Sequence, residues 1–199
     1  MNAARLGLVP EVVVGDMDSA PPALLERCAA AGAAVVWAPR QKDETDVELA
    51  LRLITGEGPA PGRLLLVAPL AGRFDHALQN LLLLPPLAAA GWEVEVADGT
   101  QSVLVLAAPG RCTAEFSGRP GEVISLLPLS PVVAGIETTG LRYPLRGESL
   151  AWGKARGASN ELVAMAARVS IASGALAIAR GGDRRHRGVR PRPPKRADA

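Results

Sequence analysis

Apolar and polar positions alternate with two different periods along the first 98 residues. Short β-branched or leucine-rich runs, bounded by glycine, proline or polar residues, predict strands, and the first two are expected to be buried. The predicted strands span residues 11–14, 34–38, 63–67 and 92–97. Apolar residues at helical spacing between them predict helices over residues 23–31, 45–54 and 74–84. Strands that alternate with helices across short loops are typical of a three-layer α/β domain with a mainly parallel sheet.

The pattern changes at Asp98-Gly99-Thr100. Beyond this point, short apolar runs are separated by turn signals, and no long amphipathic helix follows. The predicted strands span residues 102–106, 112–116, 122–127, 132–136, 141–145, 169–171 and 175–179. The last two flank Ala172-Ser173-Gly174 and are predicted to form a hairpin. This half therefore predicts an all-β domain, either a sandwich or an open barrel.

Composition and charge divide the chain into an α/β domain over residues 1–98, a β-sandwich-like domain over 99–182 and a tail over 183–199. Hydrophobic residues make up 48% of the chain and charged residues 21%, which are values of globular proteins. The tail carries seven Lys or Arg and three prolines without apolar periodicity, whereas residues 1–182 carry 15 Lys or Arg and 18 Asp or Glu. Such a tail cannot bury enough apolar surface to fold. We expect it to be disordered and solvated, and binding to nucleic acid or a membrane surface is the alternative.

Cysteine usage and hydropathy indicate a cytoplasmic protein. Cys28 and Cys112 lie far apart without zinc-type spacing, and a disulfide framework is not expected in a chain of this size. No signal-peptide pattern opens the chain. The richest apolar runs, around residues 81–90 and 169–179, contain proline or Ser-Gly breaks and are too short to span a bilayer. We therefore expect no membrane association.

The first candidate site follows the predicted strand at residues 11–14. Asp16 and Asp18 stand two residues apart, so in extended chain their carboxylates would point to the same side. Two hard oxygen ligands on one loop suit Mg²⁺, which is usually held by one or two carboxylates together with substrate phosphates. An ordinary Asp-Ser turn after a strand explains the same residues, and taken alone it is the preferred interpretation.

Two further polar clusters precede the next helices. Thr45 and Glu48 fit a capping box, which leaves Lys42 and the pair Asp43 and Asp46 unexplained. One helical turn would bring that pair of aspartates close together. The third cluster is Gly72-Arg73-Phe74-Asp75-His76. There, Asp75 can simply complement the helix dipole and His76 can be an ordinary half-buried histidine.

All three clusters fall at the same end of successive predicted strands, where the ligand crevice of an open α/β sheet lies. Several carboxylates gathered there with Lys42 and Arg73 would be electrostatically costly without a cation. Mg²⁺ and a polyphosphate would balance these charges, which favours phosphoryl transfer. The P-loop pattern GxxxxGK[ST] is absent, so a Walker-type enzyme is excluded.

Six segments resemble one known family in order and register. In the first half they are GDMDS at 15–19, KDETD at 42–46 and AGRFDH at 71–76. In the second half they are SLLPLS at 125–130, GIETTGLRYPL at 135–145 and GASNE at 157–161. Together they resemble the catalytic and thiamine-binding domains of thiamine pyrophosphokinases, and the resemblance covers residues 3–180.

The resemblance implies transfer of a diphosphate from ATP to thiamine, giving thiamine diphosphate and AMP, by a homodimer with active sites at the subunit contact. It implies that Asp16, Asp18 and Asp46 hold Mg²⁺. Asp75 would orient the reacting hydroxyl or support the metal ligands. The implied nucleotide-binding residues are Lys42, Asp43, Thr45, Arg73, His76 and Asn80. Ser159 and Asn160 would meet the thiamine pyrimidine, while Trp152 would either stack on a ring or be an ordinary core tryptophan.

Two features depart from the family pattern. The family normally begins with a strand that ends in an Asp-Gly-Gly type motif, whereas residues 2–8 here have the pattern of the last turns of the following helix. From this missing first strand we expect the 199-residue chain to bind ATP poorly or to be unstable. Normal ATP affinity of the purified chain would contradict that expectation. In addition, Ala71 replaces a usual glycine, and its methyl group would crowd a backbone approach to phosphate.

Two other functions remain open from the residues alone. A truncated homologue could bind thiamine or its diphosphate without catalysis, although the intact aspartates argue against this. The sequence Asp16-Met17-Asp18 after an apolar strand also resembles the start of a haloacid-dehalogenase-like phosphatase. That family needs a later lysine and acidic pair, for which the sequence offers no convincing candidates.

Overall fold

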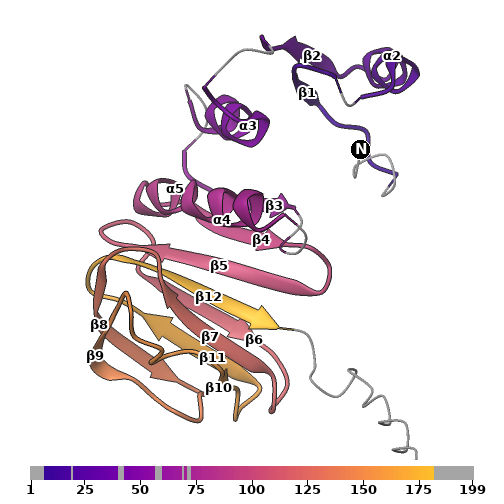
Figure 1. Ribbon diagram of the computed structural model, residues 1–199. Helices are drawn as coiled ribbons and strands as arrows, with labels where there is room; N and C mark the ends of the chain where they lie inside the picture. The colour runs from indigo at the N-terminus through magenta and orange to yellow at the C-terminus, as the bar shows by residue number, and fades with distance from the viewer. Residues whose placement is uncertain are drawn as a thin grey trace, which may run out of the picture. The chain divides into compact units, whose positions relative to one another are not determined.

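The computed structural model describes residues 7–18, 20–39, 43–56, 60–68, 70 and 73–181 (Figure 1). The chain divides into two compact units, Met1–Ala60 and Pro61–Ala199, each of which is described by itself. The predicted helix over residues 2–8 and the predicted tail over 183–199 lie largely or wholly outside the described residues. Within the described part, no helix is both long enough and apolar enough to cross a membrane.

The first unit is a β-α-β element followed by a helix. Strand β1 (Val12–Gly15) pairs in parallel with β2 (Ala34–Trp37), and α2 (Pro22–Ala30) connects them. Proline suits the start of α2 because its φ is preset and its missing N–H would have no partner there. Helix α3 (Asp46–Thr55) contacts β1. It begins at Thr45, whose side chain accepts a hydrogen bond from the Glu48 N–H at 3.2 Å, as the capping pattern predicts.

The second unit contains two sheets. A six-stranded sheet has the order β10-β7-β12-β5-β4-β3, and a four-stranded sheet has the order β6-β11-β8-β9. Strands β3 (Arg63–Val67) and β4 (Glu93–Ala97) are parallel and are joined through helices α4 (Phe74–Leu82) and α5 (Pro85–Ala89). The remaining strands pair antiparallel. They are β5 (Gln101–Ala107), β6 (Thr113–Ser117), β7 (Val123–Pro128), β8 (Val132–Thr139), β9 (Arg146–Ala151), β10 (Asn160–Glu161), β11 (Ala166–Ser170) and β12 (Ala175–Gly181).

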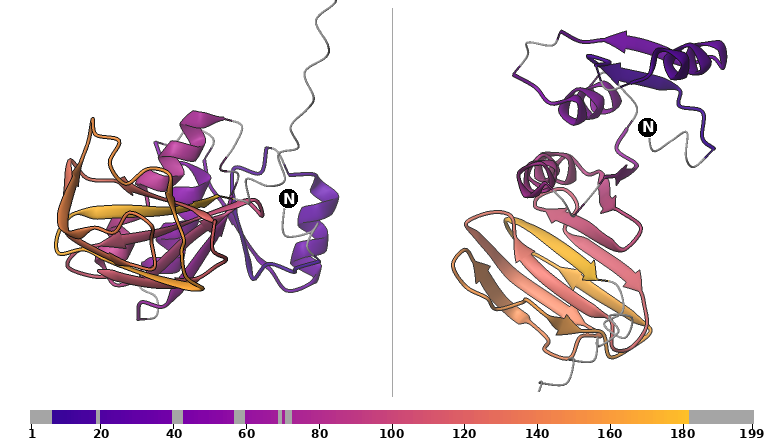
Figure 2. Two further views of the ribbon diagram at one scale, coloured as in Figure 1. Left: turned by 90° about the horizontal axis from the view of Figure 1, so that it is seen from below. Right: turned by 45° about the vertical axis from the view of Figure 1, so that its right-hand side comes forward.

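The core of this unit lies between the two sheets, which are stacked face to face (Figure 2). The fully buried side chains include Ile124 and Leu126 of β7, Ile178 of β12, and Ile136 of β8. Inward-facing residues of two stacked sheets interdigitate in this way in β-sandwiches. The fold class predicted from the sequence, an α/β part followed by a β-sandwich-like part, is therefore confirmed.

Several predicted details differ from the structure. The predicted hairpin is wrong, because β11 belongs to the four-stranded sheet and β12 to the six-stranded one. The segment between them crosses from one sheet to the other. There Gly174 has a φ of 85°, and a Cβ at this position would lie 2.5 Å from the Val132 carbonyl oxygen. Glycine is therefore required at this crossing.

Three other differences concern single elements. The predicted strand 141–145 is a loop, in which Leu141 makes one isolated bridge to Leu162. Helix α4 ends at Leu82, and Pro85 and Pro86 begin the separate helix α5. Strand β2 is not buried, since Trp37 is 66% exposed and the described part of its sheet has only two strands.

The compact units also divide the chain elsewhere than the predicted boundary at residue 98. Strand β4 ends at Ala97 and pairs with β5 from Val94↔Val105 to Ala97↔Ser102. Because these hydrogen bonds cross residue 98, strands β3 and β4 belong to the same six-stranded sheet as four strands of the β-rich half. The single, mainly parallel sheet that the sequence predicts is divided in the described residues, where the parallel pairs β1–β2 and β3–β4 lie in two separate sheets.

Candidate active site

The carboxyl end of β1 forms a strained turn. Gly15 has a φ of 149° and Met17, which is not a glycine, has a φ of 61°. The Asp16 carboxylate accepts a hydrogen bond from the Asp18 N–H at 3.1 Å, which is the aspartate turn considered above. The prediction of extended chain that points both carboxylates to the same side is therefore wrong, because the backbone at Met17 is not extended. Positive φ at a bulky residue is costly and is concentrated at functional sites, so this turn remains a candidate site.

Asp46 lies against this turn. A Cβ added to Gly15 would lie 3.1 Å from the nearest carboxylate oxygen of Asp46, the first residue of α3. Because glycine has no side chain, the Asp46 carboxylate has room beside Gly15, the residue before Asp16. The structure thus brings the first and second candidate clusters together at Asp46, as the sequence predicts. All the side chains concerned are hard carboxylate donors, which fits Mg²⁺.

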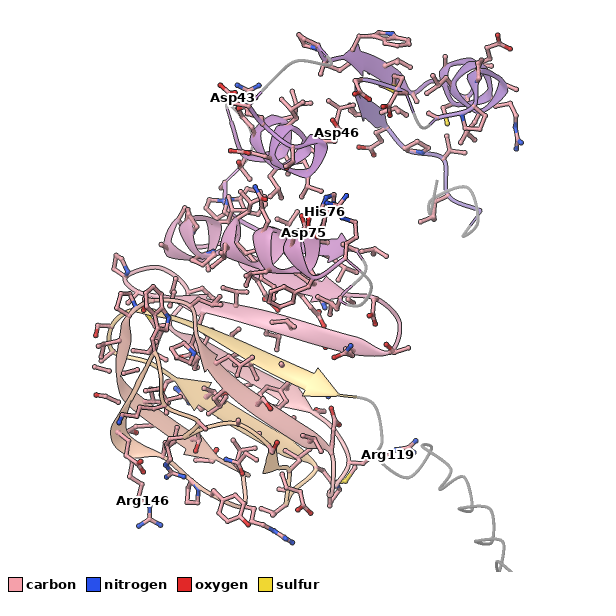
Figure 3. All side chains as sticks on the ribbon, in the orientation of Figure 1. Asp43, Asp46, Asp75, His76, Arg119 and Arg146 are labelled. Carbon is pink, nitrogen blue, oxygen red and sulfur yellow. The ribbon has the colours of Figure 1, made fainter. Side chains whose placement is uncertain are left out.

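The rest of the second cluster is less regular than predicted. Asp43 precedes the cap residue Thr45, so it lies outside α3 and helical spacing does not bring it to Asp46. Figure 3 labels both aspartates near the start of this helix. In the described residues, which exclude residues 40–42, no three His, Cys, Asp or Glu side chains form a metal-binding group. Lys42 lies outside the described residues, and the Thr45 side chain acts as the helix cap.

The third cluster opens α4 in the second unit. Arg73 donates hydrogen bonds from Nε and Nη2 to the two carboxylate oxygens of Asp75. These bonds are the main reason that the pKa of Asp75 is lowered to about 2, and the His76 N–H adds to the effect. Both side chains are largely exposed. Asp75 is therefore ionised throughout the neutral range and held in a fixed orientation at the positive end of a helix.

We expect Arg73→Gln to raise the pKa of Asp75 from about 2 toward its ordinary value of 3.8, because the main hydrogen-bond donor to its carboxylate is lost. In the unchanged chain, the ion pair between Arg73 and Asp75 is fully present above pH 3.8, the ordinary pKa of the carboxyl. It is lost as the pH falls through about 2, where Asp75 becomes protonated. A titration of carboxyl ¹³C resonances measures this directly. Asp98 is the internal control, because Thr100 lowers its pKa and should keep it at about 2 in the variant. An unchanged Asp75 titration would contradict the assignment.

The remaining predicted residues of this cluster lie on α4 or outside the described residues. His76 and Asn80 stand one turn apart on the helix. His76 is exposed (Figure 3), so the alternative of a half-buried histidine is wrong. Ala71 and Gly72 lie outside the described residues, and their predicted approach to phosphate stays a prediction.

The predicted thiamine-contacting residues form a tight turn in the β-rich unit. Ser159 has a φ of 54°, and its N–H donates to the Ser125 hydroxyl at 3.0 Å. Asn160 is buried, and its amide exchanges hydrogen bonds of 3.0 and 2.8 Å with the N–H and carbonyl of Tyr143. Its side-chain oxygen also accepts from the Glu161 N–H. In this structure Asn160 therefore holds the 141–145 loop, whereas Ser159 is exposed at the surface.

Trp152 is close in sequence to this turn and 60% exposed. Its indole N–H donates to the Pro128 carbonyl oxygen at 3.3 Å. The alternative of a core tryptophan is therefore wrong. An exposed ring anchored through its N–H remains suitable for stacking, so the predicted contact with a ligand ring stays a prediction.

Asp98 was not among the predicted site residues, although its Asp-Gly-Thr sequence is a turn signal. It follows β4, and its carboxylate accepts hydrogen bonds from the Thr100 hydroxyl and from the N–H groups of Thr100, Gln101 and Leu70. The Thr100 hydroxyl is the main cause of lowering the pKa of Asp98 to about 2. Asp98 thus ties the loop after β3 to the turn after β4, at the carboxyl end of both parallel strands.

Comparison with models of known protein families identifies the family of this chain. The thiamin pyrophosphokinase catalytic domain matches residues 1–96, and the thiamin pyrophosphokinase vitamin B1 binding domain matches residues 113–176. The chain belongs to the thiamin pyrophosphokinase family. The two matches occur in the order predicted from the six sequence segments, and together they cover most of the chain.

Individual family members agree with this membership. Thiamine pyrophosphokinase of Bacillus subtilis is 28% identical over 177 residues, which are 89% of this chain and 81% of that protein. Thiamine pyrophosphokinase 1 of rice is 28% identical over 166 residues, covering 80% of this chain and 61% of that protein. The crystal structure of the Bacillus subtilis protein superimposes with a TM-score of 0.77 at 26% identity, over 92% of this chain and 83% of the other. The Geobacillus thermodenitrificans structure gives a TM-score of 0.74 at 28% identity, with the same coverage.

Proposed function

We propose that this chain transfers a diphosphate group from ATP to the hydroxyethyl group of thiamine, producing thiamine diphosphate and AMP. The observation that carries this proposal is the match of both family domains, catalytic and vitamin B1-binding, in one chain. The similarity to proteins named thiamine pyrophosphokinase supports it. Neither a haloacid-dehalogenase-like phosphatase nor a non-catalytic binder is favoured by these comparisons.

We assign the metal site to Asp16, Asp18 and Asp46. The support is the strained turn after β1 and the Asp46 carboxylate, which lies 3.1 Å from where a Cβ on Gly15 would be and so adds a hard oxygen donor beside that turn. When bound there, Mg²⁺ would neutralise negative charge on the phosphate oxygens. The carboxylates themselves would fix the position of the cation.

Arg73 and Asp75 are assigned complementary roles. The Arg73 guanidinium can donate further hydrogen bonds to phosphate oxygens, because only Nε and Nη2 are used by Asp75. Asp75, with a pKa of about 2, is too weak a base to remove a proton efficiently near neutral pH. It instead accepts a hydrogen bond from the thiamine hydroxyl and orients this nucleophile. Lys42, Asp43, Thr45, His76 and Asn80 remain proposed nucleotide-binding residues.

Substrate recognition is assigned to the β-rich unit. Ser159 presents its hydroxyl at the surface on a turn that Ser125 supports, and we propose that it contacts the thiamine pyrimidine. A direct contact by Asn160 stays a prediction, as do a homodimer with interfacial active sites and a cytoplasmic location.

The test is an assay of the purified 199-residue chain with ATP, Mg²⁺ and thiamine, in which AMP and thiamine diphosphate are measured together. We expect equal amounts of both products, and neither product when thiamine or Mg²⁺ is omitted. Formation of ADP would show transfer of a single phosphate and contradict the proposal. Thiamine binding without AMP formation would favour the non-catalytic binder, and phosphate release from a simple phosphate ester would favour the phosphatase.

A further inference from the structure

A groove of about 670 Å³ lies in the β-rich unit, apart from the residues assigned above. Its walls are the turn between β4 and β5, the turn between β6 and β7, and the end of β12. Its size falls within the range of sites for small molecules. The two arginines that line it are Arg119 and Arg180, and the one acidic residue among its described lining residues is Glu122.

Arg180 forms a rigid wall of this groove. Its Nε donates to Glu122 at 3.0 Å, its Nη2 donates to the Ser117 carbonyl oxygen at 2.7 Å, and its guanidinium lies 5.0 Å from the centre of the Phe116 ring. The side chains of Arg180 and Glu122 are only 22% and 20% exposed. The charges of Arg180 and Glu122 neutralise each other. This pair therefore shapes the groove without adding net charge to it.

Arg119 supplies the net positive charge. It lies on the turn between β6 and β7, where its carbonyl oxygen accepts from the Glu122 N–H at 3.0 Å, so the backbone that carries it is fixed. Figure 3 shows its side chain projecting at the edge of the unit. No described residue accepts a hydrogen bond from this guanidinium.

The opposite wall offers neutral hydrogen-bond groups. The N–H groups of Thr100 and Gln101 are used by Asp98, and the Thr100 hydroxyl also donates to Asp98. Within the described part of the chain, no side-chain hydrogen bond engages the Gln101 amide or the Ser102 hydroxyl. The groove therefore combines an amide, a hydroxyl and a guanidinium that has no partner among the described residues, all carried on a hydrogen-bonded backbone.

We propose that this groove binds the phosphate group of a small molecule, with Arg119 as the charged ligand and Gln101 and Ser102 as neutral donors. A guanidinium binds two oxygens of one anion in parallel. This contact would use both oxygens of a carboxylate, whereas a phosphate has a further oxygen that can accept from the amide and the hydroxyl. The phosphate can belong to an inorganic diphosphate chain or to a phosphate monoester.

The test uses the full ¹⁵N-labelled chain without thiamine or Mg²⁺, titrated with inorganic diphosphate and separately with AMP. We expect saturable shifts of the side-chain resonances of Gln101 and Arg119. Tighter binding of diphosphate than of AMP assigns the groove to a diphosphate chain, and the reverse assigns it to a monoester. Because no turnover is involved, failure of the proposed transferase reaction would leave this result unaffected.

Variants localise the binding. Arg119→Ala should weaken the affinity reported by the Gln101 amide at least about tenfold, the loss typical of one charge-assisted hydrogen-bonding group. Arg168→Ala is the matched control, since Arg168 is an exposed arginine that pairs with Glu115 in the four-stranded sheet. The affinity of this variant for the probe should stay within about twofold of that of the unchanged chain. Unchanged affinity in Arg119→Ala, or no response of Gln101 to either probe, would overturn the proposal.

Discussion

Asp46→Asn should lower the rate of thiamine-dependent AMP formation by about a hundredfold to a thousandfold, the loss found when one preorganised electrostatic group is removed from an active site. The carboxylate that this change removes lies against Gly15, next to the turn that carries Asp16 and Asp18. Asparagine keeps the shape of the side chain but lacks the charge that a hard cation requires. The measurement is the steady-state rate of AMP formation at saturating ATP and thiamine.

Glu26→Gln provides the matched control for this variant. Glu26 is an exposed carboxylate of α2 in the same unit, and it has no assigned role at the site. We expect it to keep the activity of the unchanged chain. Asp46 is also the first residue of α3, so the loss of charge there should destabilise the fold by only about 0.3–1 kcal/mol. A folded Asp46→Asn variant with normal activity would argue against a role in holding Mg²⁺.

The second large effect is expected for Asn160→Ala, which should destabilise the β-rich unit by about 2–4 kcal/mol. Asn160 is 3% exposed and satisfies both backbone groups of Tyr143. Alanine would leave these polar groups without partners in a partly buried loop, which costs more than the bonds themselves contribute. Urea unfolding followed by circular dichroism measures the change in the free energy of unfolding.

Ser159→Ala separates structural support from substrate contact. The Ser159 backbone N–H makes the bond to Ser125, and alanine retains it, so this variant should stay within about 0.5 kcal/mol of the unchanged chain. If Ser159 contacts thiamine, the KM for thiamine should rise while stability is kept.

The Asn160→Ala prediction has its own contradicting outcome. A loss of less than about 1 kcal/mol in the free energy of unfolding would show that the 141–145 loop does not depend on the Asn160 side chain.

Local sequence chemistry predicted much of the fold. The strand predicted over residues 63–67 coincides with β3. The predicted start of α3 is also found, because the Thr45 cap depends only on a hydrogen bond within its own helix. Strands β9 and β10 were missed because they are short or polar and exist through pairing with distant partners. The wrong hairpin has the same origin, since two nearby apolar runs can join different sheets when a glycine allows the chain to cross.

The candidate site shows the same division. The candidate residues were proposed from the sequence, because clustered carboxylates and arginines suit phosphate chemistry in any fold. Their geometry could not be predicted, since the positive φ of Met17 and the position of the Asp46 carboxylate beside Gly15 depend on how the turn after β1 packs against α3. Asp98 was overlooked because its hydrogen bond to the Leu70 N–H joins two loops that are distant in sequence.

The pairing of β4 with β5 limits how the two family domains can be separated. A fragment that starts after Asp98 would retain β5 but lose the neighbouring strand that covers Val103 and Val105, which are 6% and 2% exposed in the chain. Its unprotected apolar edge would be a template for association with other molecules. A thiamine-binding fragment prepared for study should therefore begin near Pro61, so that the β3–β4 pair continues to shield this side of the sheet.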